Sequence, residues 1–133
     1  MARNVDLETK VIKKFIDKSK QDRFIQFISS VNNRHKFIEE LAHFNHFKWN
    51  LFEAVVGNEE HIISTTLQKY KVPGDICYAI SEDPELDGQL LYTSQALKEI
   101  VGHGNGTILV FGNADFIFYE GEGMKSRYIS KLI

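Results

Sequence analysis

The stretch PGDICYAI at residues 73–80 separates a region with helical spacing of apolar residues from a region of short apolar runs. Proline disfavours a helical residue before it and glycine permits a turn, so Pro73-Gly74 predicts the end of a helical region. The run Ile76–Ile80 that follows is short, apolar and rich in strand formers, which predicts a buried strand. We therefore expect helices before this point and mostly strands after it.

Upstream of Pro73, apolar residues recur at helical spacing. Residues 6–18 predict a first helix, and Ser19 begins a second, short helix that buries Phe24, Phe27, Ile28 and Val31. A third helix is predicted over 34–56, with a break near Asn45–Asn50 left open because asparagine is a weak helix former. A fourth helix is predicted over 58–70.

Downstream, the acidic segment 81–88 predicts an exposed turn, and residues 90–92 predict a further short strand. A helix is expected from Thr93 or Ser94 to Val101. The runs 107–111 and 116–119, separated by a Gly-Asn-Ala-Asp turn, predict a hairpin, and 127–130 could add a last strand. The expected class is α+β: an N-terminal helical half of about four helices packed on a small, mostly antiparallel C-terminal sheet with one inserted helix.

Composition limits the classes of function. The 133 residues suit one domain, 1–133, and the net charge of −2 is far from the basic balance of a dedicated nucleic-acid binder. The single cysteine, Cys77, forms no internal disulfide, and no apolar run is long enough to span a bilayer. We expect a soluble, cytoplasmic protein that binds neither nucleic acid nor membrane and needs no cofactor.

One set of polar residues suggests chemistry. Glu39, His43, His46, Asn50 and Glu53 share one face of the predicted third helix, where carboxylate and imidazole could hold part of a metal site. The apolar residues of the same helix lie on the opposite face, which favours a solvated role for the polar five. Trp49 lies on the flank between the two faces, and tryptophan is a frequent anchor at protein interfaces.

The glycine-rich loop His103-Gly104-Asn105-Gly106 is a second candidate. Phosphate loops run from strand to helix, whereas this loop runs from a predicted helix to a strand, so the helix dipole has the wrong sign for an anion. A turn after a helix explains the glycines without a ligand. A pocket for a small ligand between helices and sheet, near this loop and the turn at 113–115, stays open.

No motif identifies a catalytic centre, so three hypotheses remain. The first is a binding module that docks a protein partner or self-associates near His43, His46 and Trp49. The second is a metal-dependent, hydrolase-like enzyme that uses Glu39, His43 and His46. The third is a small-ligand binder whose pocket includes His103, Gly104, Asn105 and Gly106. Cys77 is expected to be a buried, unreactive thiol.

Overall fold

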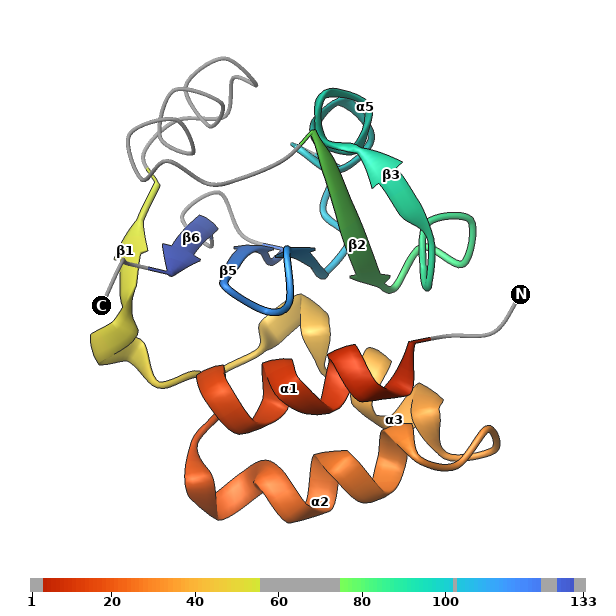
Figure 1. Cartoon of the computed structure of the whole chain (residues 1–133), viewed down its shortest axis with the longest axis vertical. Coiled ribbons are helices and arrows are strands. Elements are labelled where there is room, and N and C mark those ends of the chain that lie inside the picture. Colours follow the sequence, from red (N-terminus) through yellow and green to blue (C-terminus); the bar gives the residue numbers. More distant parts are fainter. Residues whose placement is uncertain (1–3, 56–74, 102, 123–126, 131–133) are drawn as a thin grey trace.

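A six-stranded antiparallel sheet forms the middle layer of the protein (Figure 1). The computed structural model describes residues 4–55, 75–101, 103–122 and 127–130. The strands are β1 (Phe52–Ala54), β2 (Ile76–Ser81), β3 (Leu90–Tyr92), β4 (Thr107–Phe111), β5 (Phe116–Glu120) and β6 (Arg127–Ser130). Their order is β1-β6-β5-β4-β2-β3, and each neighbouring pair is antiparallel.

Helices cover both faces of this sheet (Figure 1). One face carries α1 (Val5–Phe15), α2 (Lys18–Ile28), α3 (Arg34–Ile38) and the 3-10 turns η1 (Leu41–His43) and η2 (Trp49–Leu51). The other face carries α5 (Thr93–Ile100), which is inserted between β3 and β4. The predicted α+β class, with a helical N-terminal half, an antiparallel sheet and one inserted helix, is confirmed. No described helix combines the length and the apolar character needed to cross a membrane.

The first two helices differ from their predicted limits. The first ends at Phe15 rather than Lys18, and α2 begins at Lys18, so Asp17 and not Ser19 holds the capping position. Val31 was expected on the buried face of the second helix, but it lies in the turn after α2 and is 94% exposed. The predicted fourth helix over 58–70 lies outside the described residues.

The long third helix is the main error of the sequence analysis. The α-helix that starts at Arg34 ends at Ile38, and the chain then forms η1, an extended stretch, η2 and strand β1. The extended stretch pairs with the end of α1: the Lys48 amide donates to the Phe15 carbonyl at 2.8 Å, and the Asp17 amide to the His46 carbonyl at 2.7 Å. These long-range backbone bonds compete with helical ones, and helical spacing alone does not reveal them.

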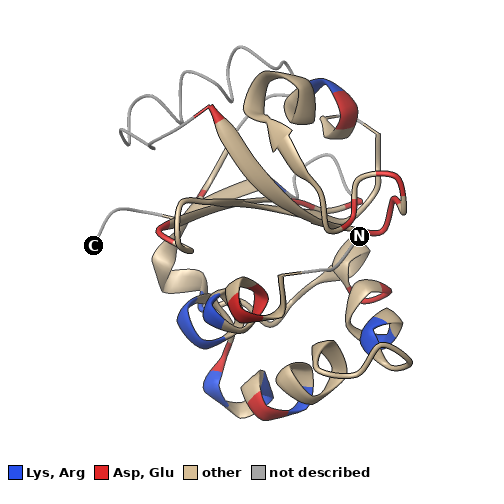
Figure 2. Ribbon diagram, turned by 45° about the vertical axis from the view of Figure 1, so that its right-hand side comes forward, with Lys and Arg blue, Asp and Glu red and all other residues tan. Residues whose placement is uncertain are grey.

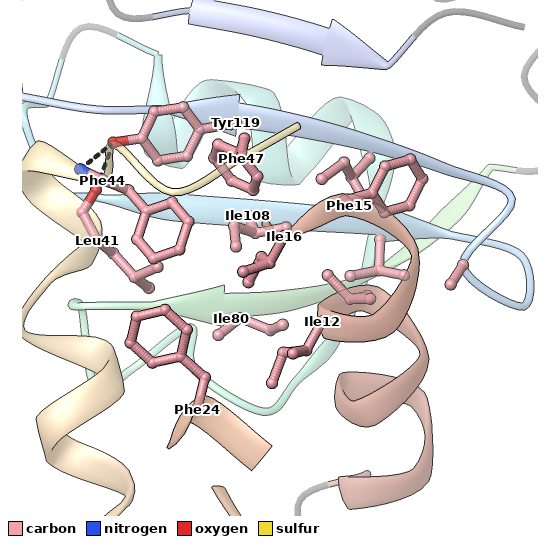
Figure 3. Packing of buried hydrophobic residues seen from close by; sticks show 14 of the residues in the cluster. Ile12, Phe15, Ile16, Phe24, Leu41, Phe44, Phe47, Ile80, Ile108 and Tyr119 are labelled. Atoms are coloured by element: carbon pink, nitrogen blue, oxygen red, sulfur yellow. Dashed lines mark hydrogen bonds between the residues drawn. The ribbon is translucent and has the colours of Figure 1, made fainter. Parts of the chain in front are cut away.

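Because the helix ends at Ile38, the residues that follow can pack into the core between the sheet and the first three helices. Phe44 and Phe47 both point into this core with ring centroids 4.6 Å apart (Figure 3). The Tyr119 hydroxyl accepts from the Phe44 amide at 3.2 Å and donates to the Leu41 carbonyl, so the sheet holds η1 in place. A second buried cluster, which includes Cys77, Leu97 and Phe118, lies on the α5 side of the sheet.

The hairpin between β4 and β5 forms as predicted. Its turn contains Gly112 and Ala114, both with positive φ, and Lys14 Nζ donates to the Ala114 carbonyl at 3.0 Å. The acidic segment 81–88 differs from its predicted exposure, because Leu86 and Asp87 are 6% and 8% exposed. Asp87 is buried because it has a cationic partner, described below.

Candidate functional site

The residues of the predicted interaction surface, His43, His46 and Trp49, have separate surroundings. His43 is exposed on η1, with its Nε2 atom 2.6 Å from Glu122 Oε2. His46 is partly buried between the rings of Phe24 and Phe44, and its Nε2 atom is 3.5 Å from Glu40 Oε1.

Trp49 contacts the rings of Phe47, Phe52 and Tyr128, and it remains 37% exposed. Part of the indole therefore stays exposed, and its role as an interface anchor stays a prediction. The rest of the ring caps the core beside β1.

The five polar residues predicted to share one helical face do not lie on one helix, so the geometric argument for a metal site no longer holds. Glu39 follows the end of α3, His43 belongs to η1, and Glu53 is in β1. Within the described ranges, no three His, Cys, Asp or Glu side chains lie close enough together to hold a metal ion.

The glycine-rich loop connects α5 to β4, the predicted order. A Cβ atom on Gly106 would lie 2.3 Å from the Ala42 amide nitrogen, so this glycine allows the loop to approach η1. Gly104 has φ of +75°, and the Asn105 carbonyl accepts from Thr107 Oγ1 at 3.2 Å. His103 is exposed. These roles are structural, as the turn interpretation expects.

Cys77 is buried on the α5 side of the sheet, and burial raises the pKa of its thiol to about 11. The nucleophilic thiolate is therefore scarce near neutral pH.

A cleft of about 750 Å³ opens between the helical layer and the loop from β2 to β3. Its lining residues come from the start of α1, the end of α2 and its following turn, α3, and the end of β2 with the loop after it: Val5; Ile28, Ser29 and Val31; Arg34, His35 and Ile38; Ser81, Glu82, Pro84 and Asp87. This volume lies within the usual range for ligand sites. A pocket between helices and sheet was expected, but the loop 103–106 and the turn at 113–115 are not among these lining residues.

Glu82 connects the predicted loop directly to the cleft. Its Oε1 atom accepts from the Gly106 amide at 2.6 Å, and the Glu82 amide donates to the Gly106 carbonyl at 3.0 Å. Glu82 is thus held in place on the cleft wall while its side chain stays partly exposed.

The floor of the cleft is a buried ionic network around Arg34. The guanidinium donates from Nε and Nη2 to both oxygens of Glu8, at 3.1 and 2.7 Å. From its other side it donates through Nη1 to Asp87 Oδ2 and through Nη2 to Asp87 Oδ1, the latter at 3.0 Å. Glu8 also accepts from the Tyr78 hydroxyl at 2.6 Å, and Asp87 accepts from the Ser81 amide at 3.1 Å.

Two members of this network, Arg34 and Tyr78, have raised pKa values. Burial alone would lower the pKa of Arg34, but its hydrogen bonds to Glu8 and Asp87 and the charges of both carboxylates raise that pKa above its usual range. Burial, with the bond to Glu8, also raises the pKa of Tyr78, so its hydroxyl stays protonated. The Glu82 side chain adds a carboxylate on the cleft wall beside the carboxylates of Glu8 and Asp87.

This network was not predicted from the sequence. Glu8 lies three and four residues before the buried Val11 and Ile12, so its place on the apolar face of α1 was a readable signal. No comparable signal marks Arg34 or Asp87, whose pairing joins α3 to a loop 53 residues later.

Comparison with protein-family models, curated proteins and solved structures gave no match to this chain. The site therefore has to be interpreted from its own geometry.

Proposed function

We propose that this chain is a non-catalytic binding module that docks a segment of a partner protein in the cleft between α3 and the β2–β3 loop. The partner segment carries a basic side chain next to an apolar one. The observation that carries the proposal is that the partly exposed Glu82 and the exposed apolar residues Val5 and Val31 line the same cleft.

The acidic part of the cleft favours a cation. The donors of Arg34 are already directed at Glu8 and Asp87, which leaves this guanidinium little capacity to bind an anion. Glu82 lies on the wall above, and Figure 2 shows the acidic residues of the β2–β3 loop in red. A lysine or arginine of the partner would therefore find the Glu82 carboxylate to pair with at this wall.

The apolar part of the cleft favours a peptide segment over a small polar ion. Val31 is 94% exposed and Val5 38% exposed, and both line the opening. Ile28 and Ile38 continue this apolar lining along α2 and α3. A segment that covers Val31 gains hydrophobic stabilisation in addition to charge attraction.

Fluorescence anisotropy with two labelled hexapeptide amides tests the proposal. One peptide alternates leucine and arginine, and the other alternates leucine and glutamate. We expect the cationic peptide to bind at least about tenfold more tightly, with an affinity that falls as salt is added. Equal binding of the two peptides, or binding of neither, would contradict the proposal.

Matched variants locate the site. Glu82→Gln keeps an acceptor for the Gly106 amide but removes the charge, and we expect it to weaken the cationic peptide by roughly threefold or more. Glu85→Gln, in the same loop but outside the cleft lining, is the control. Val31→Ser should weaken binding, whereas Leu90→Ser, at another exposed apolar residue, should not.

Trp49→Ala separates this proposal from docking at the tryptophan. Trp49 is not among the residues that line the cleft, so peptide affinity should stay unchanged in this variant. Loss of binding in Trp49→Ala with normal binding in Glu82→Gln would move the docking surface to Trp49.

A further inference from the structure

The two edge strands of the sheet, β1 and β3, differ in whether they carry a charged residue. At one edge, β1 carries Glu53 at its centre, and Trp49 packs beside this strand on Phe52. At the other edge, β3 has no charged residue in the whole stretch Gln89–Thr93. Charges on an edge strand are a common means of preventing pairing with another chain, and β3 lacks them.

The backbone of β3 has hydrogen-bonding groups that face away from the sheet. The Ala79 amide donates to the Gln89 carbonyl at 2.9 Å, and the Thr93 amide to the Asp75 carbonyl at 2.6 Å. Antiparallel strands alternate between bonded and non-bonded residue pairs, so the pairs Tyr78↔Leu90 and Ile76↔Tyr92 are non-bonded. The amides of Leu90 and Tyr92, and the Leu90 carbonyl, therefore point to the open edge.

Exposed apolar side chains gather at the same edge. Among the described residues, six large apolar side chains are exposed, and three of them lie on this strand pair: Leu90 at 71%, Tyr92 at 65% and Ile76 at 51%. The register places all three on the face of the sheet that also carries Tyr78. Leu91, on the opposite face, packs against the α5-side cluster.

We propose that two copies of this chain associate by pairing β3 with β3 across a two-fold axis at Leu91, which joins their sheets. This antiparallel register sets Leu90 opposite Tyr92 of the second copy. The Tyr92 amide of each copy then donates to the Leu90 carbonyl of the other. The Leu90 and Tyr92 side chains also meet as aliphatic–aromatic cross-strand pairs, next to Ile76.

A second copy fits this edge because the same three residues supply both halves of the contact. The outward amide of Tyr92 and the outward carbonyl of Leu90 lie at equal distances from Leu91 along the strand, so a two-fold axis brings each to its partner. No charge within Gln89–Thr93 opposes a second identical strand. The short strand predicts a weak dimer, with association that depends on protein concentration.

Sedimentation velocity over a range of protein concentrations tests the pairing. We expect a monomer–dimer equilibrium, and Leu90→Lys should raise the dimer dissociation constant by at least about tenfold because it places two like charges at the contact. Val31→Lys, which adds the same charge at an exposed apolar residue elsewhere, is the matched control. A monomer at every concentration, or equal effects of the two variants, would overturn the proposal.

Hydrogen exchange of the unaltered protein tests the backbone bond directly. The Tyr92 amide should exchange several-fold more slowly at high than at low protein concentration, while the Glu85 amide in the exposed part of the β2–β3 loop should not change. A dimer without this protection would show that the copies associate elsewhere. Neither Leu90→Lys nor the exchange of the unaltered protein changes a residue that lines the cleft, so these outcomes are independent of peptide binding there.

Discussion

Among the residues that the structure describes, each face of the sheet buries one arginine, and the two differ in how far apart their partners lie in the sequence. Arg127 in β6 faces Glu120 directly across the strand pair, seven residues earlier, with Nε 2.6 Å from Oε1. On the helical face, Arg34 joins Glu8 and Asp87, which are 26 and 53 residues away. The first arginine links neighbouring strands, whereas the second links α1, α3 and the β2–β3 loop, the walls of the cleft.

The two buried arginines contribute differently to the architecture of the protein. The Glu120–Arg127 pair lies within strands that backbone bonds already hold in register. The helices around Arg34 have no such ladder to the sheet, so the ionic network fixes their position relative to the loop. We expect the stability of the cleft to depend on Arg34 and the stability of the β5–β6 pair to depend less on Arg127.

Replacing Arg34 by methionine should have the largest effect. The variant removes the guanidinium that donates to both buried carboxylates, a change that typically costs about 3–5 kcal/mol of unfolding free energy. Urea denaturation followed by circular dichroism measures the loss. Lys36→Met, at an exposed cation on the same helix, is the control and should change stability by less than about 0.5 kcal/mol. A loss below about 1 kcal/mol for Arg34→Met would contradict the role given to the network.

Arg127→Met should be destabilising by a smaller amount. The Glu120 carboxylate loses its partner within strands that keep their backbone bonds, so we expect a loss of about 2–3 kcal/mol in the same urea assay. Lys98→Met on the exposed side of α5 is its control. The comparison between the two faces fails if Arg127→Met costs more than Arg34→Met.

At alkaline pH, the stability of the protein should depend on one buried weakly acidic group on each face of the sheet, a thiol and a phenol. Burial raises the pKa of Cys77, on the α5 side, from 9.0 to about 11, and the pKa of Tyr119, on the helical side, from 10.0 to about 12. In each case the unfolded chain loses its proton first, so stability is complete below the unfolded pKa and falls as pH rises toward the folded one. Each shift corresponds to at most about 2–3 kcal/mol.

Two variants separate these contributions in unfolding experiments at several pH values. Cys77→Ala should remove the decline that begins near pH 9, and Tyr119→Phe the decline that begins near pH 10. Identical pH profiles for the unaltered protein and both variants would show that neither buried group controls alkaline stability.

Local patterns explain which elements were predictable. The hairpin of β4 and β5 combines two β-prone runs with a short turn, so neighbouring residues contain the whole signal. Most of α1 follows from its apolar stripe. The segment after Ile38 was mispredicted because Phe37, Leu41 and Phe44 have helical spacing. All three are buried in the core, but they do not belong to one continuous helix.

The candidate site was less predictable than the fold because its charges are paired over long distances. Asp87 lies among acids that resemble an exposed turn, and its contacts with Arg34 and the Ser81 amide accompany its burial. A single sequence contains no sign of such a pairing. The exposed rim residue Val31 was missed for a related reason, since its apolar character was assigned to the core.

The position of β1 in the sheet affects how the protein can fold during translation. Phe52 in β1 pairs with Ser130 in β6, so β1 emerges from the ribosome long before its neighbour in the sheet is synthesised. Until then the aromatic residues beside β1 lack part of their covering. Such exposed apolar surface in a nascent chain is a target for chaperones and a source of aggregation. We therefore expect the pairing of β1 with β6 to form later than the pairing between β4 and β5.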